Sequence, residues 1–70
     1  MERTHVISHD LESVAYDPAR RLLEIRFQTG AIYHYSGVPE LVHKGLMSAV
    51  SKGTYFHVTI KDSYPTQRIV

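Results

Sequence analysis

Apolar and charged residues alternate over residues 23–27, whose sequence is LEIRF. This period of two is typical of a strand with one apolar and one charged face. Two further segments, residues 13–16 and 31–36, have strand composition. An Asp-Pro turn at residues 17–20 and a Thr-Gly turn at residues 29–30 separate the three segments. The pattern predicts a three-stranded antiparallel meander.

Tyr33 and Tyr35 lie two apart on the third predicted strand, so both point to the same face of the sheet. A three-residue loop that ends at Gly30 pairs Tyr33 with Ile25 and Tyr35 with Leu23, on the apolar face. A two-residue loop would place both tyrosines on the charged face, as a stacking platform for bases. That loop needs positive φ at a β-branched threonine, which is unfavourable. We therefore expect Tyr33 and Tyr35 to be mainly core.

A helix is predicted to follow the third strand. Pro39 suits the first position of a helix, and Glu40 is favourable near its N-terminus. We expect the helix to end at Gly53 in the left-handed conformation, and Gly45 to allow close approach to the sheet. The spacing of apolar residues gives it a single apolar face, formed by Val42, Leu46, Ala49 and Val50 and widened by Leu41.

Residues 54–64 fit two different elements. Residues 57–60 have strand composition, whereas Phe56, Ile60 and Tyr64 are spaced by four, as in a helix. Thr54 could cap such a helix. A short C-terminal helix is favoured, and a strand stays open. The expected fold is α+β, with the three-stranded meander, one helix on its apolar face and the short C-terminal element.

The chain has 70 residues and no cysteine, so we expect one domain over residues 1–70, without disulfides or thiolate metal sites. Its apolar runs are far shorter than the roughly 20 residues that span a bilayer. The first ten residues contain no apolar core of a signal peptide. A cytoplasmic protein is expected.

Charge is distributed unevenly along the chain. The net charge is +1, but residues 1–40 carry −2 and residues 41–70 carry +3. A basic C-terminal half is compatible with a surface that faces phosphates, although such spacing is also common on ordinary solvated surfaces.

No constellation of catalytic residues is apparent. The sequence contains no phosphate-binding glycine loop and no GxSxG motif. His5 and His9 would share a metal ion only on a helix, and their segment has an extended pattern. We therefore expect a protein that is not an enzyme and has no cofactor and no metal.

Residues 51–57 are the best candidate for a binding surface. Lys52 and backbone N–H groups near a helix start suit a phosphate, and Tyr55 and His57 could contact a base or sugar. The alternative is a turn between helices in which an aromatic side chain fills the core. Lys61 and Arg68 extend the candidate phosphate-binding set.

A series of short motifs covers about residues 6 to 69: Ser8 through Tyr16, LEIRF at 23–27, GAIYHY at 30–35, VP at 38–39, LMSAVSKG at 46–53, YF at 55–56, Ile60 and Tyr64-Pro65. Their order resembles the KTSC domain, a family named for its occurrence at the C-terminus of some lysyl-tRNA synthetases. Its hallmark is the Tyr-x-Tyr at residues 33–35. Ala15 and His57 depart from that pattern, where Gly and Asn are expected, and Gly45 is unusual.

The resemblance implies a small bacterial or phage-type domain of unknown function, for which RNA binding has been suggested from the synthetase context. The first hypothesis is accordingly a weak RNA-binding module that uses the residues named above. The second is a protein-interaction or homodimer module. It would use a sheet edge, or an exposed Leu22–Ile32 pair beside Arg26 on the open face of the sheet.

Overall fold

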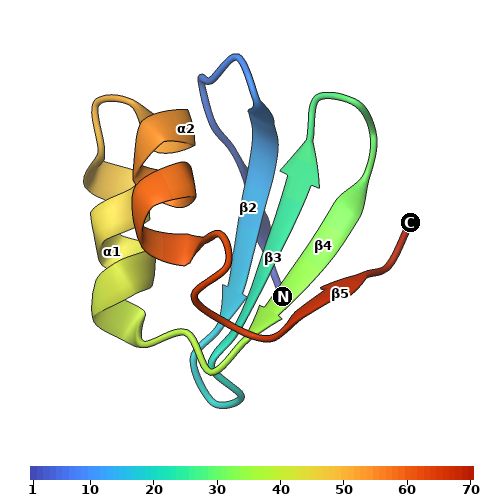
Figure 1. Cartoon of the computed structure of the whole chain (residues 1–70), viewed down its shortest axis with the longest axis vertical. Helices are drawn as coiled ribbons and strands as arrows, with labels where there is room; N and C mark the ends of the chain where they lie inside the picture. Colours follow the sequence, from blue (N-terminus) through green and yellow to red (C-terminus); the bar gives the residue numbers. More distant parts are fainter.

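The structure is a computed structural model that describes residues 1–70. It contains one antiparallel sheet, partly covered on one face by a helical layer (Figure 1). The five strands lie in the order β1-β2-β3-β4-β5 and comprise β1 (Arg3–His5), β2 (Leu11–Asp17), β3 (Leu22–Phe27), β4 (Ile32–Ser36) and β5 (Thr66–Arg68).

The three predicted strands correspond to β2, β3 and β4, but the expected three-stranded sheet is two strands too small. The added strands β1 and β5 are the sheet edges, each three residues long and exposed throughout. Neither strand has a buried face, so neither has the alternation that marks a strand in the sequence.

The register between β3 and β4 confirms the three-residue loop. Leu23 pairs with Tyr35 and Ile25 pairs with Tyr33. The Phe27 amide donates to the Ala31 carbonyl at 2.9 Å, which closes the loop. Gly30 has a φ of +93°, which glycine adopts without steric penalty. Both tyrosines therefore lie on the face that the helical layer covers in part.

The helical layer consists of three short segments, α1 (Glu40–Ser48), α2 (Lys52–Tyr55) and the π-helix η1 (Phe56–Ile60). The predicted end of the first helix at Gly53 is wrong. Ala49 is already extended, with φ −65° and ψ 138°, so Val50 leaves the apolar face and is fully exposed. Ser51 starts the next helix because its hydroxyl accepts from the Thr54 amide at 3.3 Å.

Two further expectations for α1 are corrected. Leu41 does not widen the apolar face, since its side chain is 79% exposed. Gly45 does not approach the sheet. A Cβ there would overlap the ring of Tyr55, so the glycine allows α1 and α2 to pack together.

The favoured helical interpretation of the tail is confirmed through Ile60, and it includes a π-helical turn. The chain then turns at residues 61–63 and returns to the sheet as β5. No helix is long and apolar enough to cross a membrane.

The hydrophobic core lies between the helical layer and the sheet. It contains Tyr35, as expected, whereas Tyr33 only packs against its margin. The nine buried members are Leu11, Val14, Leu23, Ile25, Tyr35, Val38, Leu46, Phe56 and Ile60.

Charged side chains form a network across β1, β3 and β4. Glu24 lies 2.6 Å from an Arg3 nitrogen and 2.8 Å from His34 Nε2. Burial alone would raise the pKa of Glu24, but the hydrogen bonds from His34 and Arg3 outweigh it and hold that pKa below its usual range. The network joins the edge strand β1 to the centre of the sheet.

The expectation that Leu22 and Ile32 form an exposed pair on this sheet is wrong for Ile32, which is only 8% exposed. The chain that follows β5 runs beside Ile32. The Ile69 amide donates to the Ile32 carbonyl at 2.7 Å, and the Ile32 amide donates to the Val70 carbonyl at 3.1 Å. The C-terminal strand missing from the predicted fold therefore removes Ile32 from the sheet edge.

Two leucines of α1 test this packing. Leu46→Ala removes a fully buried side chain and should lower the free energy of unfolding by about 2–5 kcal/mol. Leu41→Ala on the same helix should change it by less than about 0.5 kcal/mol. Chemical denaturation of both variants provides the measurement, and similar losses in the two would contradict the described helix orientation.

Candidate functional site

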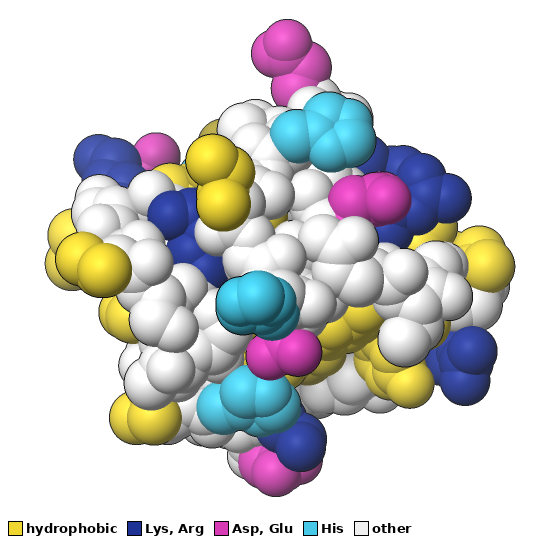
Figure 2. All heavy atoms as spheres, turned by 90° about the horizontal axis from the view of Figure 1, so that it is seen from above, with side chains coloured by type: hydrophobic (Ala, Val, Ile, Leu, Met, Phe, Trp, Pro, Cys, Tyr) yellow, Lys and Arg dark blue, Asp and Glu magenta, His cyan; other side chains and the backbone are white.

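A pocket of about 600 Å³ opens over the part of the sheet that the helical layer leaves uncovered. The helices lie on the β2 side, and β4 and β5 remain clear of them (Figure 1). Seen from above, hydrophobic surface lies in a recess bordered by histidine, acidic and basic side chains (Figure 2). The incomplete cover of the sheet thus creates the main hollow of the molecule.

Aromatic side chains form the apolar part of the pocket. Phe27 meets Tyr33 edge to face, with ring centroids 5.6 Å apart. Phe56, from η1, packs against Phe27 and Tyr35, with centroids 5.4 Å apart in each pair. Each ring is held by another ring, so the aromatic surface is fixed before any ligand arrives.

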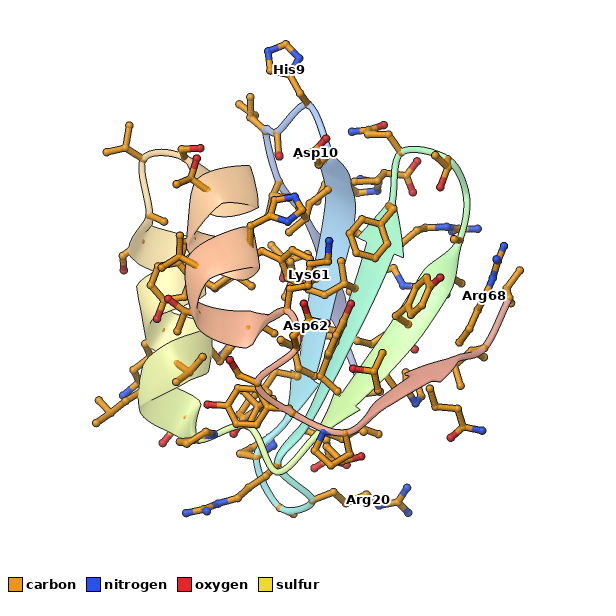
Figure 3. The ribbon with its side chains drawn as sticks, in the orientation of Figure 1. His9, Asp10, Arg20, Lys61, Asp62 and Arg68 are labelled. Carbon is orange, nitrogen blue, oxygen red and sulfur yellow. The ribbon has the colours of Figure 1, made fainter.

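Charged side chains stand on two sides of this aromatic surface. Lys61 and Asp62 lie at the end of the helical layer and Arg68 lies on β5, with β3 and β4 between them (Figure 3). The Arg68 guanidinium is 5.9 Å from the centre of the Tyr33 ring, within the range of a cation–π contact. Arg68 Nε also donates to the Val70 carbonyl at 3.0 Å.

His57 and Asp10 complete the rim at the end near the loop before β2. His57 Nε2 lies 3.9 Å from an Asp10 oxygen, and both side chains are more than half exposed. His57 belongs to the π-helical turn η1. Such turns are rare and often occur at functional sites.

The structure brings together three of the five residues predicted to bind nucleic acid, namely Lys61, Arg68 and His57. Lys52 and Tyr55 lie elsewhere. Lys52 Nζ donates to the Ala49 carbonyl at 3.0 Å and lines a second hollow of about 410 Å³. Tyr55 packs over Gly45, as the interpretation of residues 51–57 as a turn between helices implied. The predicted surface is therefore divided between two places.

Phe27, Asp10 and Asp62 line the pocket although the sequence does not predict them as site residues, and Tyr33, predicted to be mainly core, lines it as well. Tyr33 packs against the core and lines the pocket at once. The core interpretation of the Tyr-x-Tyr pattern describes Tyr33 in part, whereas the alternative that both tyrosines lie on the charged face is wrong.

Two of the other histidines, His34 and His43, have structural neighbours away from the pocket. His34 pairs with Glu24, and the ring of His43 stacks on Tyr16 with centroids 4.5 Å apart. Burial lowers the pKa of His43. His5 lies on β1, whereas His9 lies in the loop before β2 and lines the pocket, and both are exposed. No three His, Asp or Glu side chains lie close enough together to hold a metal ion.

Comparison with known proteins adds the family. The KTSC domain family matches the chain over residues 7–64. The chain belongs to this family. The crystal structure of a KTSC domain protein from Yersinia pestis is 43% identical and superposes with a TM-score of 0.96, covering 99% of this chain and 97% of that one.

Two kinds of relative carry the KTSC domain. An uncharacterised protein from Stutzerimonas stutzeri is 38% identical over 91% of this chain and 90% of its own length. A lysine–tRNA ligase from Nostoc is 36% identical over 84% of this chain, but the match covers only 10% of the ligase. The KTSC domain therefore occurs both as most of a small protein and as a small part of a large enzyme.

Tyr35 has the most perturbed ionisation in the KTSC pocket. Burial, followed by the nearby Tyr33 and Asp62, raises the pKa of its phenol to about 12. The folded state therefore favours the neutral phenol. The stability that this group contributes is complete below its ordinary pKa of 10.0 and is lost as the pH rises through about 12.

Alkaline unfolding tests this environment. The free energy of unfolding should fall between pH 10 and about pH 12, and it should fall less in Tyr35→Phe, which has no phenol to ionise. Chemical denaturation across this range gives both slopes. Tyr64→Phe, which removes the phenol of a partly buried residue outside the pocket, is the matched control and should keep more of the wild-type slope than Tyr35→Phe does. Identical slopes in all three proteins would contradict the burial of Tyr35.

Proposed function

We propose that this KTSC domain is a non-catalytic binding module that takes an unpaired base of single-stranded RNA into the aromatic pocket. The observation that supports this most is the fixed aromatic surface of Phe27 and Tyr33, which line the same pocket as Lys61 and Arg68. An aromatic ring beside cations matches the alternation of bases and phosphates along a single strand.

Stacking supplies the larger share of the proposed affinity. A base stacked on an aromatic side chain contributes about 1–3 kcal/mol. Phe27 and Tyr33 are already held edge to face, so little conformational entropy is lost when a base arrives. A base inside a duplex is not available for such contacts, and the pocket accordingly favours single strands.

The charges around the pocket suit one or two phosphates. Lys61 and Arg68 form no ion pair, whereas Arg3, Arg20 and Arg26 are each paired with a carboxylate. Asp10 and Asp62 share the rim and offset part of the positive charge. The proposed contact is therefore local and weak, unlike a broad basic surface for a polyanion.

The relatives add independent support. A segment similar to this chain forms about a tenth of the length of lysine–tRNA ligases from Nostoc and Trichormus. A domain joined to an enzyme that acts on tRNA is well placed to contact RNA, although such an association does not fix function by itself. Self-association has less support, because Ile32 is buried and both edge strands are only three residues long, which limits edge pairing.

Amide NMR titration with a short single-stranded RNA tests the proposal. Shifts should gather around Phe27, Tyr33, Lys61 and Arg68. With two phosphate contacts, the logarithm of the affinity plotted against the logarithm of the salt concentration should have a slope of about −1.4. A fourfold rise in salt should then weaken binding about sevenfold. A spectrum unchanged at low salt would contradict the proposal.

Matched lysine and arginine variants locate the contacts. Lys61→Gln and Arg68→Gln should each reduce the salt slope by about 0.7, because each removes one phosphate contact. Lys44→Gln removes an exposed charge on α1, outside the pocket, and should leave both affinity and slope unchanged. Equal effects of all three would point to general charge attraction instead of this site.

A further inference from the structure

The second hollow, of about 410 Å³, adjoins the aromatic pocket at the loop before β2. Its lining comes from residues 7–10 of that loop, from residues 50–54 and from His57. His9, Asp10 and His57 line both the pocket and the second hollow. Figure 3 shows His9 and Asp10 at the end of the molecule where the loop turns. The second hollow therefore continues the pocket beyond a boundary formed by these three residues.

Gly53 allows the two segments that form the second hollow to pack closely. The residue is buried, and a Cβ there would lie 2.9 Å from Asp10 Oδ2 and 3.8 Å from Ser8 Oγ. The first distance is shorter than ordinary van der Waals contact, so a side chain at this position would displace Asp10. The missing side chain thus lets the polar groups of the loop and of α2 lie together.

Hydrogen-bond donors that are still available are the main chemical feature of the second hollow. Lys52 Nζ has three N–H groups and uses one of them, which donates to the Ala49 carbonyl at 3.0 Å. Ser8 Oγ accepts from the amides of Asp10 and Leu11 at 3.2 Å each, and its own proton remains available. A cation and a hydroxyl donor therefore face the same hollow from opposite segments of the chain.

The hydroxyls of Ser51 and Thr54 add a further donor. Their oxygens are 2.9 Å apart, and Ser51 Oγ also accepts from the Thr54 amide at 3.3 Å. Only one of the two hydroxyl protons lies between the oxygens, so the other is free to donate. The one carboxylate of the hollow, Asp10, lies 3.9 Å from His57 Nε2. Lysine and hydroxyl donors in this combination are typical of contacts to phosphate oxygens.

The second hollow has no stacking surface like that of the pocket. Its two hydrophobic residues, Ile7 and Val50, are aliphatic, and no Phe, Tyr or Trp lines it. Bases bind on aromatic rings, which the pocket supplies with Phe27 and Tyr33. The composition of the second hollow therefore suits the backbone of a nucleic-acid strand and not another base.

We infer that the second hollow holds a phosphate of the same RNA strand whose base occupies the aromatic pocket. This inference rests on the proposed function and adds a second contact region to it. The strand passes over Asp10 and His57, and a further phosphate meets Lys52 and the hydroxyls of Ser8 and Thr54. Because every nucleotide carries the same phosphate, this contact adds affinity without sequence choice.

Two uridine ligands of different length separate the two hollows. Uridine monophosphate is small enough to occupy the aromatic pocket alone. Octauridine is long enough to reach both hollows, because eight nucleotides at roughly 3.4 Å each match the longest dimension of the domain, 27 Å. In amide NMR titrations, the monophosphate should shift resonances around Phe27 and Tyr33. Octauridine should shift these and also the resonances of residues 51–54.

Lys52→Gln tests the phosphate contact itself. With contacts from Lys52, Lys61 and Arg68, the logarithm of octauridine affinity against the logarithm of salt concentration should have a slope of about −2.1. Lys52→Gln should reduce this slope to about −1.4, so that a fourfold rise in salt weakens binding about sevenfold instead of about eighteenfold. Lys44→Gln removes an exposed charge outside both hollows and should keep the wild-type slope. Fluorescence anisotropy over a range of salt concentrations gives these slopes.

Octauridine shifts confined to the aromatic pocket, or a slope that Lys52→Gln does not change, would overturn this inference and leave RNA binding standing. Equal shifts of residues 51–54 with the monophosphate and with octauridine would also overturn it, because they would indicate an anion site independent of the strand. Shifts at Phe27 and Tyr33 with the monophosphate check that Lys52→Gln is folded. The absence of any shift with either ligand would overturn the proposed function, and this inference with it.

Discussion

The packing of Phe56 against the sheet is the contact on which both the core and the pocket depend. Phe56 is 2% exposed and meets the rings of Phe27 and Tyr35. It is also the first residue of η1, so its position sets where the π-helical turn lies relative to β3 and β4. On one side this ring closes the hydrophobic core, and on the other it forms the wall of a hollow. Core stability and pocket shape are therefore properties of the same cluster of rings.

The central strands and their faces could be predicted because local chemistry determines them. Gly30 allows positive φ where Thr29 does not, and this difference selects the loop that places Tyr33 and Tyr35 on the inner face. The edge strands could not be predicted in the same way. Residues 66–68 are polar and exposed, and they form a strand only because β4 offers its unpaired backbone. That pairing is a long-range effect without a local signal.

The first helix shows how a sequence signal can be assigned to the wrong event. The Ser-Lys-Gly segment has the composition of a helix end, but Ser51 caps the start of the next helix. The actual end at Ser48 lies among residues with ordinary helical preferences. Gly45 permits a close approach, but the approaching group is the ring of Tyr55 instead of the predicted sheet. A glycine indicates that space is needed, and only the tertiary structure shows what fills it.

The candidate site was predictable in part. Lys61, Arg68 and His57 meet at one pocket, although they come from a turn, a strand and a helix, and charge alone could not distinguish them from Lys52. The role of Tyr33 depends on how far the helical layer extends across the sheet, which periodicity does not report. The way β5 is connected to the rest of the sheet affects how the pocket can move. Each of the other strand pairs is joined by a short loop, but β5 reaches β4 only after the whole helical segment has been crossed. A short exposed strand closed by so long a loop should open at a lower free energy than the core. Each such opening carries Arg68 away from Tyr33, so one wall of the pocket can exchange between open and closed states while the rest of the domain stays folded.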